Sequence, residues 1–254
     1  MQWIRGLRSL GRLYSYEEES REQRTVIKSG TCFESSGSYN TVMEEIPDKN
    51  VFMMCEKLNS SALSNLSDEY HTRTCRKDEL DIWKAFPFDD PQTAKEYHGF
   101  MTDFFNQVYA SKGDLFYAKC LFVCDEKDTP IGTAFIWKVY DEFNTVHWYK
   151  VLKAYEGKGI GRALLSIIMK ELQEDDYPVY LHTQPASYRA IKLYSDFGFK
   201  LLSDPIIGGR TNDLEECLPI LEKYMPKNDF NKLQITNAPI NFIKKLETVK
   251  ENHF

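Results

Sequence analysis

The stretch Tyr155-Glu156-Gly157-Lys158-Gly159-Ile160-Gly161-Arg162-Ala163-Leu164-Leu165 decides the fold of the chain around it. An apolar and aromatic run, Val146 to Leu152, precedes it, and an amphipathic pattern, Ala163 to Leu172, follows. Glycines at alternate positions let backbone N–H groups approach an anion closely. The unpaired N–H groups and positive dipole end of the following helix point at the same place. Strand, glycine-rich turn and helix together predict a site for a phosphate-bearing cofactor.

On the N-terminal side of this stretch, the sequence predicts a strand, several helices and a three-stranded meander. The expected strands are Val51 to Cys55, Leu115 to Cys124, Ile131 to Tyr140 and Thr145 to Leu152. The expected helices run from Asn59 or Ser60 to about Arg73, from Lys77 to Ala85, and from Pro91, after the capping Asp90, to Lys112.

On the C-terminal side, strands and helices alternate and the pattern then changes after Pro205. The expected elements are strand Val179 to Thr183, helix Ala186 to Asp196, strand Phe199 to Leu202, helix Asp213 to Tyr224, strand Leu233 to Thr236 and helix Ile240 to Val249. Runs of strands beside strand–helix–strand units predict an α/β (α+β) fold, with a mixed sheet and helices on both faces.

Composition narrows the classes of function. The net charge of -6 and pI near 5.5 argue against a general nucleic-acid or anionic-membrane binder. No run approaches the roughly 18 apolar residues of a membrane span. The cysteines form no C-x-x-C pair and no zinc-type cluster, so we expect no metal. With no secretory signal, we expect reduced thiols and a cytoplasmic protein.

The N-terminal region, residues 1–50, reads as an extension. Its first fourteen residues carry Arg5, Arg8 and Arg12 without an acid, which favours a short docked helix, with a transit peptide or a membrane-surface helix as the alternative. One short strand is expected around Thr25 to Lys28.

The spacing of the glycines discriminates between cofactors. Gly157-x-Gly159-x-Gly161 does not have the G-x-G-x-x-G spacing of a dinucleotide fold, and no G-x-x-x-x-G-K-[ST] loop is present. The loop instead resembles the Arg/Gln-x-x-Gly-x-Gly/Ala signature of the GCN5-related N-acetyltransferases (GNAT). A second stretch, Ser187-x-x-Ala190-x-x-Leu193-Tyr194-x-x-x-Gly198-Phe199, resembles a later motif of that family, in the right order and at the right separation.

This resemblance covers residues 51–203 and implies a GNAT-like fold with a mostly antiparallel sheet that binds acetyl-CoA. It implies a cofactor site at Val151, Lys153, Glu156, Gly157, Lys158, Gly159, Ile160, Gly161, Arg162, Ser187 and Ala190. Glu156 departs from the signature, since the family has Arg or Gln there; a side chain that points to solvent, or the charges of Lys158 and Arg162, would offset it. Residues 204–254 are expected to complete the domain with the last strand near 233–236.

The resemblance also implies direct transfer in a ternary complex. Tyr194 stands at the position of the family's tyrosine acid, and a backbone N–H near Val151 is the implied oxyanion donor. His147 is the candidate base, because alternation places it on one strand face with Tyr149 and Val151. Water, Asp141 and Glu142 are rivals for that role. His182 and Gln184 are candidates either to line the cleft or to make structural hydrogen bonds. Arg73 and Arg76 fit a receptor for a substrate carboxylate or a solvated basic face. An acceptor pocket or simply part of the core would account for the aromatic residues Trp83, Phe86, Phe88, Trp137 and Tyr140.

The leading functional hypothesis is an acetyl-CoA-dependent N-acetyltransferase acting on a small-molecule amine. A protein or peptide N-acetyltransferase, and an acyl-CoA-binding sensor or structural protein without transferase activity, are the alternatives. We expect no nucleic-acid partner and no membrane span, and the sequence is compatible with a homodimer.

Overall fold

The structure is a computed structural model that describes residues 46–249. The helix expected in the first fourteen residues and the strand expected at 25–28 lie outside the described residues.

The central element is an eight-stranded sheet in the order β10-β7-β1-β6-β5-β4-β3-β2. Its strands are β1 (Val51–Cys55), β2 (His71–Thr74), β3 (Leu121–Cys124), β4 (Pro130–Val139), β5 (Phe143–Val151), β6 (Val179–Thr183), β7 (Phe199–Leu202) and β10 (Ile235–Thr236). Only the β5–β6 and β10–β7 pairs are parallel within this sheet. The expected mixed, mostly antiparallel sheet is therefore confirmed.

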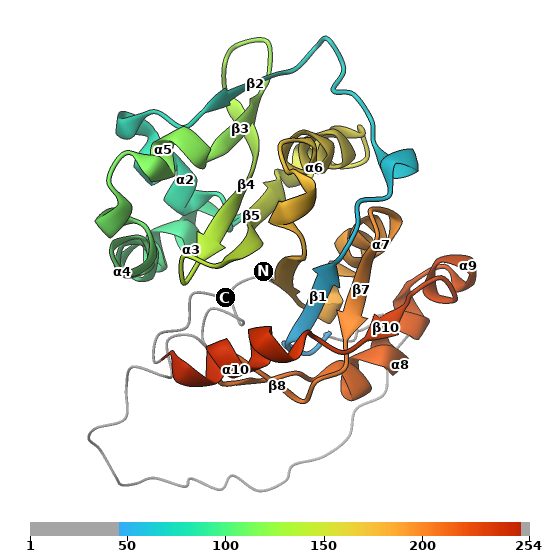
Figure 1. The fold of residues 1–254 in the computed structure, drawn as a ribbon. Helices are drawn as coiled ribbons and strands as arrows, with labels where there is room; N and C mark the ends of the chain where they lie inside the picture. Colours follow the sequence, from blue (N-terminus) through green and yellow to red (C-terminus); the bar gives the residue numbers. More distant parts are fainter. Residues whose placement is uncertain (1–45, 250–254) are drawn as a thin grey trace, which may run out of the picture.

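Helices cover the sheet on both faces (Figure 1). The α-helices are α2 (Leu80–Ala85), α3 (Pro91–Glu96), α4 (His98–Val108), α5 (Leu115–Lys119), α6 (Ile160–Lys170), α7 (Tyr188–Asp196), α8 (Leu214–Tyr224), α9 (Lys227–Phe230) and α10 (Ile240–Thr248). The short 3-10 turns are η1 (Ser60–Ala62), η2 (Lys77–Glu79), η3 (Ala110–Lys112), η4 (Lys153–Tyr155), η5 (Glu174–Asp176) and η6 (Pro185–Ser187). A small hairpin, β8 (Ile206–Ile207) and β9 (Arg210–Thr211), follows β7.

Two hydrophobic cores lie on opposite faces of the sheet. The first, which we call the α6 face, contains buried apolar side chains of α6, α7 and α8 such as Leu164, Ile191 and Leu221. The second, the α10 face, contains aromatic side chains of α2, α4, α5 and α10, including Trp83 and Phe242. Successive residues of a strand point to opposite faces of the sheet, so alternate residues of a central strand enter the two cores. Such a strand is therefore buried on both faces.

The sheet opens between β5 and β6. The two strands pair in parallel only at Asn144 with Val179 and Thr145 with Tyr180. Beyond these pairs, β5 continues to Val151 beside β4, and β6 continues to Thr183 beside β1. We call the region past Thr145 and Tyr180 the β5–β6 fork. In the fork, the backbone N–H and C=O groups of β5 and β6 that face each other do not pair with one another.

Three expected elements differ from the structure. The single helix expected from Pro91 to Lys112 is divided into α3, α4 and the 3-10 turn η3. The helix from Asn59 or Ser60 to Arg73 is a single 3-10 turn, capped by Asn59 as expected, followed by irregular chain and strand β2. Thr72 and Arg73 are extended because they pair with Val123 and Phe122 of β3, so tertiary pairing overrides a weak local preference. The pairing puts β2 at the edge of the sheet.

The expected strand from Leu115 to Cys124 is divided into helix α5 and the shorter strand β3. Phe116 of α5 is fully buried and packs edge-on against Trp83. The centre of its ring lies 5.0 Å from the centre of the Tyr109 ring. A short apolar run fits either a strand or a buried helix, and only the packing on the α10 face decides between them.

Candidate functional site

The glycine loop supplies a row of free backbone donors. Gly157 and Gly159 have φ values of 79° and 80°, which a side chain would disfavour. The first hydrogen bond of α6 runs from Ala163 N to Gly159 O at 3.1 Å. The N–H groups of Ile160, Gly161 and Arg162 therefore have no acceptor among residues 46–249. Together with the helix dipole they form an anion site at the start of α6.

A second backbone donor faces the fork. Leu152 N donates to Ile131 O at 2.9 Å, so the N–H of Leu152 points toward β4. Because N–H directions alternate along a strand, the N–H of Val151 points the other way, toward β6. β6 does not pair with β5 at this level, which leaves this N–H directed into the β5–β6 fork. This is the position expected of the oxyanion donor.

The carboxylate of Glu156 is exposed and lies near Arg189 of α7. Its Oε2 lies 3.6 Å from Arg189 Nη1, and both side chains are about half or more exposed, at 48% and 78%. Lys153 and Lys158 are exposed, and Lys158 Nζ lies 5.0 Å from the centre of the Tyr155 ring. Lys153 and Lys158 thus place positive charge at the surface of the loop on long side chains. The carboxylate of Glu156 lies in solvent, where screening weakens its repulsion of a bound phosphate. Arg189 was not identified from the sequence.

Arg162 joins two helices instead of facing the loop. Its Nη2 lies 2.5 Å from Asp196 Oδ2 on α7, and its Nη1 donates to Ala62 O at 3.1 Å. Lys192 also binds Asp196, at 2.6 Å. The guanidinium is therefore already engaged, and it holds α7 against α6. The backbone N–H of Arg162, not its side chain, belongs to the anion site. Ser187 and Ala190 flank Arg189 at the N-terminal end of α7, half-buried and next to the loop.

Tyr194 lies on the α6 face, beside the loop. Its ring packs edge-on against Tyr149 at 5.6 Å and against Phe199 at 5.8 Å. The side chain is buried, and its hydroxyl makes no hydrogen bond to another described residue. Burial raises the pKa of Tyr194 well above its usual value of 10.0, so the phenol keeps its proton at neutral pH. A protonated phenol can donate a hydrogen bond or a proton.

Tyr149 explains the third glycine of the loop. A methyl group on Gly161 would overlap the hydroxyl of Tyr149, and Tyr149 Cζ would lie 3.5 Å from it. The phenol of β5 therefore lies directly beneath the first turn of α6. Gly161 is required for this close approach and not for an unusual backbone angle. The sequence placed Gly161 in the motif but gave no sign of the tyrosine that contacts it.

A bulge in β5 separates His147 from Tyr149. The β4–β5 register shifts between Thr133 and Phe135, and Trp148 has a φ of 50°. The extra residue reverses the alternation, so that Tyr149 and Val151 pack on the α6 face while His147 contacts Phe135 and Tyr109 on the α10 face. The expectation that His147 shares a face with Tyr149 and Val151 was therefore wrong.

His147 belongs to a buried hydrogen-bonded network. Its Nδ1 lies 2.5 Å from Tyr109 Oη, which also accepts a hydrogen bond from Trp148 Nε1 at 2.9 Å. Burial raises the pKa of Tyr109 well above its usual value, which keeps this phenol neutral. The hydrogen of this contact can belong to either atom: Tyr109 can donate its O–H to Nδ1, or Nδ1–H can donate to Tyr109, and only the second tautomer makes Nε2 the basic position of the ring. No sequence signal identified Tyr109.

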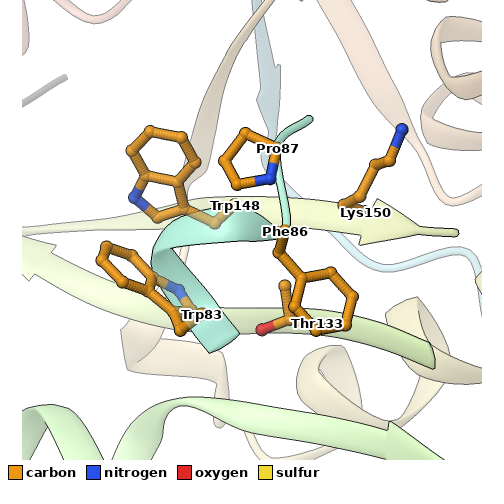
Figure 2. Close-up of a pocket in the computed structure, with 6 residues that line it drawn as sticks. All are labelled: Trp83, Phe86, Pro87, Thr133, Trp148 and Lys150. Atoms are coloured by element: carbon orange, nitrogen blue, oxygen red, sulfur yellow. The ribbon is translucent and has the colours of Figure 1, made fainter. Parts of the chain in front are cut away.

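Beside this network the surface has a shallow, mainly aromatic hollow (Figure 2). It is lined by Trp83, Phe86, Pro87, Thr133, Trp148 and Lys150. Figure 2 shows the two tryptophans on one side, with Lys150 extending away from them on the other side. Lys150 Nζ binds Asp89 at 2.9 Å, and Trp83 Nε1 has no acceptor among the described residues. The expected aromatic set is thus assembled in part, on the α10 face.

Arg73 and Arg76, expected as carboxylate receptors, are occupied. Arg73 binds Glu79 through both Nη atoms at 2.7 Å and Asp128 through Nε at 2.7 Å. Arg76 binds Asp128 at 2.7 Å. These bonds fasten the edge strand β2 to the start of α2 and to the β3–β4 turn. The guanidiniums have a structural role there.

Comparison with known families agrees with this geometry. Residues 80–199, a little under half of the chain, match the sequence model of the acetyltransferase (GNAT) family. No curated protein matches the chain.

Several solved structures are similar to the chain. An acetyltransferase of the GNAT family from Colwellia psychrerythraea has 13% identity and a TM-score of 0.42, with 62% of this chain and 54% of that chain covered. A GCN5-related N-acetyltransferase from Sphaerobacter thermophilus has 16% identity and a TM-score of 0.38, with 61% and 49% covered. A Drosophila protein has 16% identity and a TM-score of 0.39, with 62% and 49% covered. The chain spans about half the length of these structures.

Two further findings concern the described residues alone. No helix between residues 46 and 249 is long and apolar enough to span a bilayer. The five cysteines in this range are free thiols, and all are buried.

Proposed function

We propose that the protein transfers an acetyl group from acetyl-CoA to the primary amine of a small molecule, with both substrates bound at once. The observation that carries the proposal is the alignment of three features at the β5–β6 fork: the free N–H groups of α6, the Val151 N–H and the buried Tyr194 phenol. Residues 51–203 would form the catalytic core, and residues 204–254 would complete it through β10.

Acetyl-CoA supplies an acetyl group activated as a thioester. The N–H groups of Ile160, Gly161 and Arg162 would hold its pyrophosphate, because they are unpaired and lie at a positive helix end. Gly157 and Gly159 keep the backbone there free of side chains. Arg189 and Lys158 add positive charge from solvent. Val151 N–H would stabilise the carbonyl oxygen as negative charge develops on it.

Proton transfer would use the two faces of the sheet. Tyr194, on the α6 face, would give its proton to the departing thiolate and recover one from solvent. His147, on the α10 face, would accept a proton from the attacking amine at Nε2, directly or through water, with Nδ1 held by Tyr109. This division places the donor substrate on the α6 face and the amine on the α10 face, beside the aromatic hollow.

The test is release of free thiol from acetyl-CoA in the presence of a panel of primary amines, with the acetylated amine identified by mass. The proposal expects release that depends on both acetyl-CoA and at least one amine. Tight binding of acetyl-CoA without release for any amine would instead support an acyl-CoA sensor. Acetylation confined to peptides would refute the small-molecule acceptor.

A further inference from the structure

Arg210 differs from every other arginine in the described chain. The other four each meet a carboxylate: Arg73 and Arg76 at Glu79 and Asp128, Arg162 at Asp196, and Arg189 at Glu156. Arg210 has no carboxylate within 4.0 Å among residues 46–249, and its one hydrogen bond runs from Nη1 to His182 Nδ1 at 3.3 Å. A guanidinium has five N–H donors, so most of them have no protein acceptor.

The hairpin that carries Arg210 directs its side chain inward. Gly208 and Gly209 both have positive φ, as a two-residue hairpin turn requires. Across this turn Arg210 pairs with Ile207, so the two side chains share a face. Ile207 is 1% exposed in the core of the α10 face, whereas its neighbour Ile206 is 63% exposed. Arg210 therefore enters the molecule on the α10 face.

His182 fixes the guanidinium at the fork. Its ring contacts Phe52 on the α10 face, and it lies two residues beyond Tyr180, the last residue of β6 that pairs with β5. Since Nδ1 faces the Arg210 donor, Nε2 carries the hydrogen and donates to Asn50 Oδ1 at 3.0 Å. Asn50 in turn donates to Thr211 O at 3.1 Å in the hairpin. The guanidinium is held in place by neutral groups.

The charge at this position is not compensated by the protein. Burial lowers the pKa of Arg210 only to about 10, so the guanidinium remains cationic at neutral pH. Burial also lowers the pKa of His182 well below its usual value, which keeps the imidazole neutral. A partly buried cation without an anion is unfavourable, and a guanidinium pairs best with a planar carboxylate.

We infer that Arg210 is the receptor for a carboxylate on the acceptor, so that the amine substrate is an amino acid or a related amino carboxylic acid. The inference rests on the proposed function, because it assigns the second substrate of that reaction. One guanidinium beside a neutral histidine matches the single charge of a carboxylate better than the double charge of a phosphate. The position suits the acceptor, since it lies on the same face as His147 and opposite to the glycine loop.

The experiment measures binding separately from transfer. Isothermal titration would compare the proteinogenic L-amino acids, β-alanine and γ-aminobutyrate with their carboxamides, which keep the amine and lose the negative charge. Each titration is run with and without coenzyme A, which has no acetyl group to give. The proteins are the full chain, Arg210→Gln, Arg210→Lys and the control Arg76→Gln, which removes the same charge at the distant Asp128 cluster.

We expect at least one amino acid to bind tenfold or more tightly than its carboxamide. Arg210→Gln should abolish that difference, Arg210→Lys should retain part of it, and Arg76→Gln should retain all of it. Thermal unfolding should show Arg210→Gln as stable as the wild-type protein, because the lost cation has no anionic partner among the described residues. Equal binding of acid and amide, preference surviving in Arg210→Gln, preference for O-phosphoethanolamine, or no binding by any probe would each overturn the inference.

The outcomes also separate this inference from the proposed function. Arg210-dependent binding of an amino acid without thiol release from acetyl-CoA would retain the carboxylate receptor and refute the transferase. Thiol release with amines that lack a carboxylate, unchanged in Arg210→Gln, would retain the transferase and refute the receptor.

Discussion

At the scale of single residues, the proposed mechanism depends most on Tyr194. Its phenol is buried on the α6 face, makes no hydrogen bond to another described residue and keeps its proton because burial raises its pKa. Tyr194→Phe keeps the ring packing against Tyr149 and removes only the hydroxyl. We expect turnover to fall by about 100-fold or more, the usual contribution of a proton donor, with acetyl-CoA affinity nearly unchanged. Steady-state kinetics and titration calorimetry on the same preparation measure both quantities, and unchanged turnover would remove Tyr194 from the mechanism.

The contact between Tyr149 and Gly161 makes a second residue-level prediction. Gly161→Ala places a methyl group against the Tyr149 hydroxyl and should destabilise the fold by about 1–3 kcal/mol. In a Tyr149→Phe background the nearest ring carbon lies 3.5 Å away, so the same change should cost nothing or stabilise the helix slightly. A double-mutant cycle of urea unfolding measures the coupling. Additive effects would contradict the proposed contact.

Residue identity alone could predict part of this site. Gly157, Gly159 and Tyr194 stand in motifs whose spacing is visible in the sequence, and the structure brings the two motifs together. The face of His147 could not be predicted, because the bulge at Trp148 follows from the β4–β5 register and not from local pattern. Arg210 gives no sequence signal either: its distinction is the lack of an acidic neighbour in the folded chain.

At the scale of elements, α10 closes the α10 face over β6. Phe242 is 0% exposed and stacks on the Tyr180 ring at 3.8 Å, with the Phe143 ring at 4.9 Å. Phe242→Ala removes this contact and leaves a cavity, so the free energy of unfolding should fall by about 3–5 kcal/mol. Ile240→Ala, at a 68% exposed position of the same helix, is the matched control and should change it by about 0.5 kcal/mol or less. Equal effects in chemical denaturation would show that α10 is not docked as described.

The boundaries of the helices and strands show which elements could be predicted from sequence patterns alone. The strands that alternate or are fully buried, such as β1 and β6, were predicted within a residue or two. The expected helix after Asn59 and the expected strand after Leu115 failed because both depended on non-local contacts, namely pairing with β3 and packing of Phe116. Short apolar or polar segments have little intrinsic preference, so the surrounding fold determines their conformation.

At the scale of the whole molecule, stability should depend on pH through His182. Burial lowers its pKa well below the usual 6.5, so the folded protein holds this ring neutral while the unfolded chain protonates it. The unfolded state then binds more protons below about pH 6.5, and stability falls as the pH decreases, by about 1.4 kcal/mol per pH unit for one proton. The stability difference between the wild-type protein and His182→Asn should therefore shrink between pH 7 and pH 5. A difference that is constant across this range, measured by urea unfolding, would contradict the buried neutral histidine.

In the proposed function the two faces of the sheet have different roles. The glycine loop and Tyr194 lie on the α6 face, whereas His147, the aromatic hollow and Arg210 lie on the α10 face. The β5–β6 fork is where the sheet lacks hydrogen bonds between these two sides. Two substrates could meet there without crossing the core. Because Tyr194 and Arg210 lie on opposite faces, their proposed roles should be independent. Variants of Tyr194 should affect acetyl transfer, and variants of Arg210 should affect the choice of acceptor.

The most direct test of the account is the mass-resolved acetylation of an amine panel by wild-type protein and Tyr194→Phe. The account predicts that the wild-type protein forms a singly acetylated amine and one free coenzyme A thiol per turnover, and that Tyr194→Phe binds acetyl-CoA normally but forms product about 100-fold more slowly. Absence of acetylated product from the wild-type protein with every amine, despite acetyl-CoA binding, would contradict it.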